Sequence, residues 1–149
     1  LLLNQTDGHY LLLALAAVVA ACDSAAYFVG RSVGGVKLAP LFSPNKTLSG
    51  SFGGIVAAIA VMVSFAGASA LAPIIGLEPI NGLDLDVALF LGCGVAVLSQ
   101  IGDLMESALK RRLNVKDSGS ILPGHGGLLD RFDGYLFNVP GFYLFFFVI

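Results

Sequence analysis

Apolar residues occur along this chain in four long runs separated by short polar segments. A helix needs about 20 apolar residues to cross the hydrocarbon core of a bilayer. The first two runs reach that length, the third reaches it by continuing to Lys110, and the fourth contains Pro140-Gly141 and is a marginal span. The pattern predicts an all-α fold, a polytopic membrane helix bundle with cytoplasmic active-site loops. The expected spans are about 10–30, 52–76, 85–110 and 134–149.

The composition supports a membrane protein. Hydrophobic residues make up 56% of the 149 residues and charged residues only 12%, while a soluble domain has about 25% charged residues. Cys22 and Cys93 lie in apolar runs without a spacing motif. We therefore expect both to be small buried hydrophobic residues rather than a disulfide or a metal-binding pair.

Charge alternates from one connecting segment to the next. Segment 30–51 carries three bases and no acid, segment 77–86 carries three acids and no base, and segment 103–133 carries all the remaining Lys and Arg. Basic loops of membrane proteins stay in the cytoplasm. If the helices alternate in direction, segments 30–51 and 103–133 therefore both face the cytoplasm.

Two polar features lie in or beside the first two helices. Asp23 lies deep in the first apolar run, where a charge costs about 2.5–3.5 kcal/mol on insertion scales. It either reaches water at the helix end or faces an internal polar site. The Gly-rich segment 30–51 offers Lys46 and Ser49 as phosphate contacts. An equal alternative is a solvated loop that attracts anionic lipid.

The third helix ends in a polar stripe. Asp103, Glu106, Ser107 and Lys110 follow the spacing i, i+3, i+4 and i+7, so we expect them to share one face. Such a stripe either forms a surface ion pair worth little or holds a divalent cation beside a phosphate. If the segment downstream from Leu128 opens the fourth helix, Asp130 and Asp133 share a face, where they either favour the helix dipole or belong to a site. Carboxylates bind Mg²⁺ and bases bind phosphate oxygens, so this region predicts a metal–nucleotide phosphate site at the membrane surface.

The segment 107–133 resembles the signature of the phosphatidate cytidylyltransferases, the CDP-diacylglycerol synthases. Residues between Asp23 and Thr47 also look like the cytoplasmic loop that precedes this signature in the family. The resemblance thus covers nearly the whole chain. The matching positions of the signature are Ser107, Lys110, Arg111, Lys116, Asp117, Pro123, His125, Gly126, Gly127, Asp130, Arg131 and Asp133.

This resemblance implies transfer of a cytidylyl group from CTP to phosphatidate, which gives CDP-diacylglycerol and pyrophosphate. It implies that Mg²⁺, with a monovalent cation as an open addition, is held by Asp103, Asp130 and Asp133, with Asp23 a weaker candidate. Four bases, Lys110, Arg111, Lys116 and Arg131, would neutralise phosphate charge. The expected substrate contacts are Lys46, Ser49, Ser107, His125, Gly126 and Gly127.

The resemblance also implies a setting for the protein. Residues 1–149 are expected to be the C-terminal catalytic membrane portion, since family members carry further helices upstream. We expect a homodimer in the bacterial inner membrane, with its active site facing the cytoplasm and no nucleic-acid partner. Three alternatives stay open: a CTP-dependent lipid-alcohol kinase, a membrane transport protein, and a structural subunit derived from such an enzyme.

Overall fold

The computed structural model describes residues 8–41, 43–71, 74, 83–113, 115 and 129–147. Within these residues the predicted all-α membrane bundle is confirmed, with one addition, a small two-stranded antiparallel hairpin that the sequence pattern did not predict. The elements are α1 (Gly8–Val33), β1 (Lys37–Ala39), β2 (Ser43–Thr47), α2 (Leu48–Leu71), α3 (Leu85–Arg112) and α4 (Leu129–Phe147).

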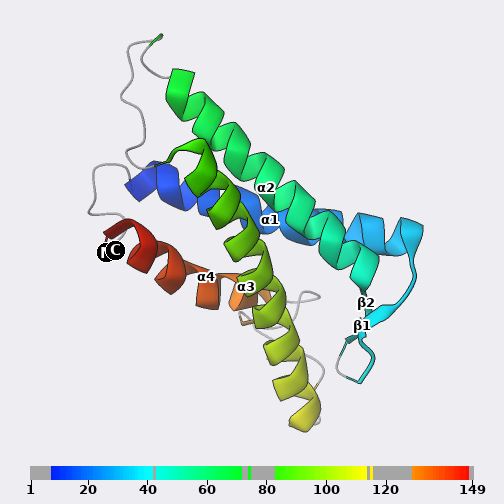
Figure 1. The fold of residues 1–149 in the computed structure, drawn as a ribbon. Coiled ribbons are helices and arrows are strands. Elements are labelled where there is room, and N and C mark those ends of the chain that lie inside the picture. The colour runs from blue at the N-terminus through cyan, green and yellow to red at the C-terminus, as the bar shows by residue number, and fades with distance from the viewer. Residues whose placement is uncertain are drawn as a thin grey trace.

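The helices are arranged so that each packs chiefly against the next one along the chain. α1 and α2 lie side by side in opposite directions, and the β hairpin joins them at one end (Figure 1). α3 crosses this pair obliquely, and α4 turns back alongside α3. Among the described residues α1, α2 and α3 are long and apolar enough to cross a membrane, whereas the marginal α4 is not in this group.

Two glycines explain where α1 ends, and a threonine hydroxyl explains where α2 begins. α1 stops at Val33 because Gly34 and Gly35 follow with φ of 67° and 102°, and the Gly34 amide still donates to the Gly30 carbonyl at 3.1 Å. α2 starts at Leu48, four residues earlier than predicted, because the Thr47 hydroxyl caps it by accepting from the Gly50 amide at 3.2 Å. Hydropathy alone cannot show such a cap.

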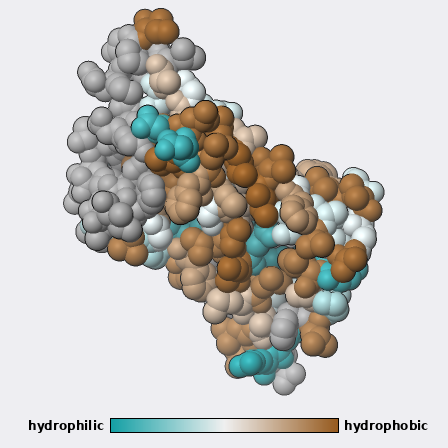
Figure 2. Space-filling model, in the orientation of Figure 1, coloured by the Kyte–Doolittle hydropathy of each residue, from teal (hydrophilic) through white to brown (hydrophobic). Residues whose placement is uncertain are grey.

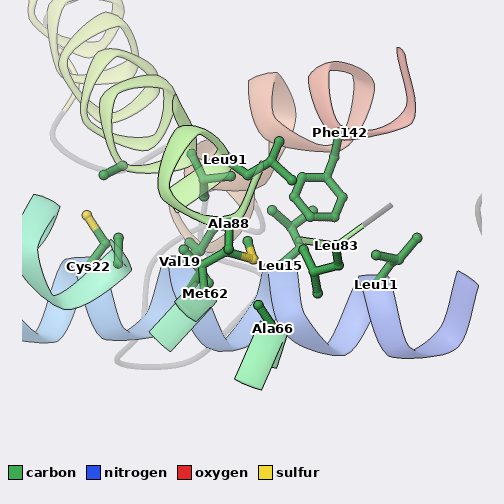
Figure 3. Packing of buried hydrophobic residues seen from close by; sticks show 14 residues of the cluster. Leu11, Leu15, Val19, Cys22, Met62, Ala66, Leu83, Ala88, Leu91 and Phe142 are labelled. Carbon is green, nitrogen blue, oxygen red and sulfur yellow. The ribbon is translucent and has the colours of Figure 1, made fainter. Parts of the chain in front are cut away.

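A single apolar core is built from all four helices (Figure 3). Cys22 is fully buried in it, as expected. Cys93 is exposed on α3, so its predicted burial is wrong. A lipid-facing position already lies in an apolar medium, so an apolar run does not show which side chains face protein. The labelled core residues are Leu11, Leu15, Val19, Cys22, Met62, Ala66, Leu83, Ala88, Leu91 and Phe142.

The outer surface is largely apolar, as lipid contact requires. Figure 2 shows brown, hydrophobic side chains over much of one face and hydrophilic side chains in separate patches, one of them at the lower end, where α3 finishes. That end of α3 carries Lys110, Arg111 and Arg112 in its last turn. The polarity of the surface therefore changes along α3 from an apolar shaft to a basic tip.

Glycines allow the helices to approach closely. A Cβ atom added at Gly50 would lie 2.5 Å from the Ala26 carbonyl oxygen of α1, and one at Gly92 would lie 2.8 Å from the Ile59 Cα of α2. Small residues at such crossings are the usual means by which membrane helices pack, because lipid tails supply no hydrophobic force between them. The close packing of α1 and α3 against α2 thus depends on the absence of a side chain at Gly50 and Gly92.

This packing predicts opposite effects for two neighbouring glycines of α3. Gly92→Ala should lower the free energy of unfolding in detergent by about 1–3 kcal/mol, because its methyl group meets backbone. Gly94→Ala, which meets nothing within 4 Å, should be neutral or stabilise by up to about 1 kcal/mol through helix propensity. Denaturant titration followed by circular dichroism measures both, and equal effects would contradict the packing described.

Candidate active site

A cavity of about 640 Å³ opens between α1, α2, α3 and the β hairpin. This volume is within the usual range for small-molecule sites, about 300–1,000 Å³. Its wall combines bases from the hairpin side with carboxylates and an amide from α1 and α3. The polar residues that line it include Asp23, Tyr27, Arg31, Lys37, Asn45, Lys46, Thr47, Ser51, Gln100 and Asp103.

Lys46 and Asp103 form an ion pair across this cavity. The Lys46 Nζ atom of β2 lies 2.7 Å from the Asp103 Oδ2 atom of α3, and the two residues are 57 positions apart in sequence. Their side chains stay 31% and 22% exposed, so the pair contributes little to stability, about 0–1 kcal/mol. Its importance is geometric, because it shows that segment 30–51 and the end of α3 lie on the same side of the bundle, as the charge pattern predicted.

The predicted polar stripe on α3 is split between two sites. Asp103 faces the cavity, while Glu106 is buried and lies 3.4 Å from the Lys110 ammonium. Glu106 lines a second, mostly apolar groove of about 400 Å³ beside Leu136 and Phe137 of α4. Positions i and i+3 differ by about 60° around a helix. The expected single face is wrong for these two carboxylates, because they line different sites, whereas Glu106 and Lys110 form the ion pair that the stripe allowed.

Asp23 faces the internal site rather than only the helix end. Its side chain is exposed and lines the same cavity as Asp103. Both interpretations left open by the sequence fit this position, because the side chain reaches water and also lines the cavity. Asp23 and Asp103 bring carboxylates from α1 and α3 to one space, although 80 residues separate them in the chain.

α4 packs on α3 close to Ser99. A Cβ atom added at Gly134 of α4 would lie 2.8 Å from the Ser99 hydroxyl of α3, and one at Gly141 would lie 3.4 Å from the Leu98 side chain. α4 crosses α3 at an oblique angle (Figure 1). Asp130 precedes Gly134 by about one helical turn, so the start of α4 that carries it lies beside the part of α3 that carries Ser99.

Several predicted site residues fall outside what the structure describes. The side chains of Asp130, Arg131 and Asp133 are not described, although all three lie in the first two turns of α4. A second group lies wholly outside the described residues and stays a prediction: Lys116, Asp117, Pro123, His125, Gly126 and Gly127.

Other predicted residues are described but do not line the cavity. Lys110 and Arg111 lie in the last turn of α3, about 10 Å beyond Asp103 along the helix axis, and Ser107 lies between. The Ser49 hydroxyl donates to the Gly34 carbonyl at 2.5 Å and bonds the Thr47 hydroxyl at 3.1 Å. Ser49 thus links the start of α2 to the residue that follows α1. Of the two phosphate contacts predicted in segment 30–51, Lys46 lines the cavity and Ser49 does not.

Gln100 and Ser51 are among the cavity-lining polar residues that the sequence reasoning missed, as are Tyr27, Arg31, Lys37, Asn45 and Thr47. The Ser51 hydroxyl donates to the Gln100 Oε1 atom, and the Gln100 Nε2 atom donates to the Ser51 carbonyl at 3.1 Å. A second donor contact runs from Nε2 to the Cys22 sulfur at 3.9 Å. One signal was available: an amide inside an apolar run, three residues before Asp103, is costly unless it finds partners.

The described residues fit a divalent cation in part. They hold no cluster of three His, Cys, Asp or Glu side chains. However, Asp103 already holds a positive charge, the Lys46 ammonium, at 2.7 Å. Asp23 adds a second carboxylate to the same cavity. Carboxylate oxygens suit Mg²⁺, which keeps several waters and needs few protein ligands.

Comparison with known proteins places the chain in a family. A model of the cytidylyltransferase family matches residues 1–149. The chain belongs to the cytidylyltransferase family. Within this family it is 49% identical over 126 residues to the phosphatidate cytidylyltransferase of Bacillus subtilis (strain 168), covering 85% of the chain. It is 47% identical over 142 residues to that of Brucella suis biovar 1 (strain 1330), covering 95%.

A third cytidylyltransferase extends the comparison. The phosphatidate cytidylyltransferase of Staphylococcus haemolyticus (strain JCSC1435) is 42% identical over 139 residues, covering 92% of the chain. The matches cover 43%, 48% and 49% of the Bacillus, Brucella and Staphylococcus proteins, so the chain spans about half of their length. With three helices among the described residues able to cross a membrane, the chain is an integral membrane protein.

The ion pair predicts a small, specific coupling. Lys46→Met and Asp103→Asn should together destabilise the protein by less than the sum of the single changes, with a coupling of about 0.2–1 kcal/mol that falls as salt rises. Lys46→Met combined with Asp86→Asn, at the far end of α3, should be additive. Equilibrium unfolding in detergent measures the six free energies that the two combinations require. Equal coupling for both combinations would contradict the pair.

Proposed function

We propose that this protein transfers the cytidylyl group of CTP to phosphatidate, giving CDP-diacylglycerol and pyrophosphate for phospholipid synthesis. The observation that carries the proposal is the cavity in which Lys46 of the basic hairpin meets Asp103 of α3, in a chain of the cytidylyltransferase family. Relatives named phosphatidate cytidylyltransferase, 42–49% identical, support this substrate pair.

The reaction needs no protein nucleophile. A phosphate oxygen of phosphatidate attacks the α-phosphorus of CTP, the bond from that phosphorus to the bridging β-phosphate oxygen breaks, and pyrophosphate leaves with the electron pair. The attacking oxygen is already anionic, so no proton has to be removed from it. The protein's contribution is therefore alignment and neutralisation of charge, as in other phosphoryl-type transfers.

The cavity supplies opposite charges on facing walls. Lys46, Arg31 and Lys37 line it from the hairpin and the end of α1, where they can bind phosphate oxygens. Asp23 and Asp103 line it from α1 and α3, and with Asp130 and Asp133 of α4 they form the proposed Mg²⁺ ligands. When bound, Mg²⁺ would neutralise the developing charge on the triphosphate. Lys110, Arg111, Lys116 and Arg131 are proposed to neutralise further phosphate charge around this site.

The membrane setting follows from charge and hydropathy. We place the cavity at the cytoplasmic face because its hairpin and the tip of α3 carry the basic residues. CTP would enter from the cytoplasm, while the acyl chains of phosphatidate stay in lipid. A homodimer, and a monovalent cation beside Mg²⁺, are further parts of the proposal that the family resemblance supports.

One labelling experiment tests the reaction. Membranes containing the protein are incubated with phosphatidate, Mg²⁺ and CTP labelled in the α-phosphate, and label in the lipid phase is counted. Asp103→Asn should lower the rate at least about 100-fold, as loss of one charge-stabilising group does elsewhere. Asp86→Asn, a carboxylate on the first turn of the same helix, should leave it unchanged.

CTP labelled in the γ-phosphate distinguishes cytidylyl transfer from the CTP-dependent lipid-alcohol kinase. The γ-label should leave in pyrophosphate and never reach lipid if the proposal holds. Lipid that carries γ-label when a lipid alcohol replaces phosphatidate would contradict cytidylyl transfer and favour the kinase. An Asp103→Asn protein that transfers α-label as fast as Asp86→Asn would remove Asp103 from the site.

A further inference from the structure

Both polar atoms of the Gln100 amide are engaged by neighbouring helices. Its Oε1 atom accepts from the Ser51 hydroxyl, and its Nε2 atom donates to the Ser51 carbonyl at 3.1 Å and to the Cys22 sulfur at 3.9 Å. A side-chain amide has one acceptor oxygen and two N–H donors, so these contacts use all three. Gln100 is therefore built to hold helices together rather than to bind substrate.

The two bonds to Ser51 form a clamp between α3 and the first turn of α2. A bond that is accepted and a bond that is donated by the same amide fix both the sliding and the rotation of one helix against the other. The clamp is directional and partly buried. By contrast, the Lys46–Asp103 pair ends on a long flexible side chain that is partly in water, so it cannot set the helix position by itself.

The clamp and the ion pair connect the same two parts of the chain. Asp103 follows Gln100 by three residues, so the two are neighbours on α3. Ser51 lies in the first turn of α2, and Lys46 precedes it by five residues, in β2. A shift of α3 at Gln100 must therefore move the Asp103 carboxylate relative to Lys46, across the cavity where the reaction is proposed.

We propose that Gln100 is a positioning residue, and that its clamp on Ser51 sets where the Asp103 carboxylate stands opposite Lys46 for cytidylyl transfer. This inference rests on the proposed function. A misplacement of about 1 Å in a reacting site can cost about 100-fold in rate. Loss of the clamp should therefore act on kcat and on the use of Mg²⁺, with a smaller change in the KM for CTP.

Three substitutions in the full chain test the clamp in membranes. Ser51→Ala removes one hydroxyl, and Gln100→Met keeps the length of the side chain without its amide. Each should lower kcat about tenfold or more and raise the Mg²⁺ concentration for half-maximal rate at least about threefold. The double variant should be no slower than the slower single variant, because both changes break one unit. Ser51→Thr, which keeps the hydroxyl, should recover most of the rate lost in Ser51→Ala.

Ser64→Ala is the matched control. The Ser64 hydroxyl donates to the Ala60 carbonyl within α2 at 2.7 Å. The substitution therefore removes a serine hydroxyl from the same helix as Ser51, but one that bonds within its own helix. Variants whose kcat and Mg²⁺ dependence stay within twofold of this control would overturn the proposal. So would a double variant whose loss equals the product of the single losses. Circular dichroism of each purified variant confirms that it is folded, and Ser51→Ala carries the test if Gln100→Met is not.

Cys22 gives a readout that does not depend on activity. The chain has two cysteines, and Cys93→Ser leaves Cys22 as the only thiol. Cys22 is fully buried where α1 meets Gln100 of α3, so a looser contact between these helices should expose its thiol and speed its modification by a small methanethiosulfonate reagent at least about threefold. Both Ser51→Ala and Gln100→Met should show it, and Ser64→Ala should not.

The two readouts separate the two ideas. Unchanged modification of Cys22 in both variants overturns the clamp, whether or not the protein is active. Faster modification in both variants, with no label transfer by the unsubstituted protein, overturns the proposed function and leaves the clamp as a lock between helices. Faster modification together with the kinetic changes supports both.

Discussion

The cavity depends on how closely α1 and α2 approach one another. At Gly50 a single added carbon would lie 2.5 Å from the Ala26 carbonyl oxygen, and at Gly54 it would lie 2.9 Å from the Cys22 carbonyl oxygen. In lipid this contact is held by packing alone, because the surrounding tails are as apolar as the helices. The approach brings the capped start of α2 beside the end of α1. The β hairpin that joins them then carries Lys46 to the face of α3.

The described charges of the cavity lie where water or an opposite charge is near. Burying an isolated charge in a spanning helix is costly, and internal polar groups therefore gather around shared cavities. Asp23, Asp103 and Lys46 line one cavity. Gln100 and Ser51 line it too and are hydrogen-bonded to one another. The ion pair adds little energy, whereas the amide clamp adds direction. Stability and site geometry thus come from different interactions.

Much of this organisation could be predicted from the sequence, for a physical reason. Span length and charge alternation are local properties, so the helices and the shared side of the two basic segments followed from the pattern, whereas the Thr47 cap that starts α2 did not. Asp23 and Asp103 were also found, because a carboxylate in an apolar run is conspicuous. The split of Asp103 from Glu106 could not be predicted, because it depends on which neighbours α3 meets on each side. The Gln100–Ser51 contact joins residues 49 positions apart, and the hairpin depends on pairing that hydropathy does not encode.

The proposed reaction depends above all on the triphosphate of CTP binding at Lys46. The most direct measurement is the rate at which an amine-reactive reagent modifies Lys46, followed by mass spectrometry of the protein in membranes. Mg²⁺ with CTP should slow this modification several-fold, while cytidine, which has the base but no phosphates, should not. Unchanged modification of Lys46 in a preparation that transfers cytidylyl groups to lipid would show that the phosphates bind elsewhere, and would contradict the account.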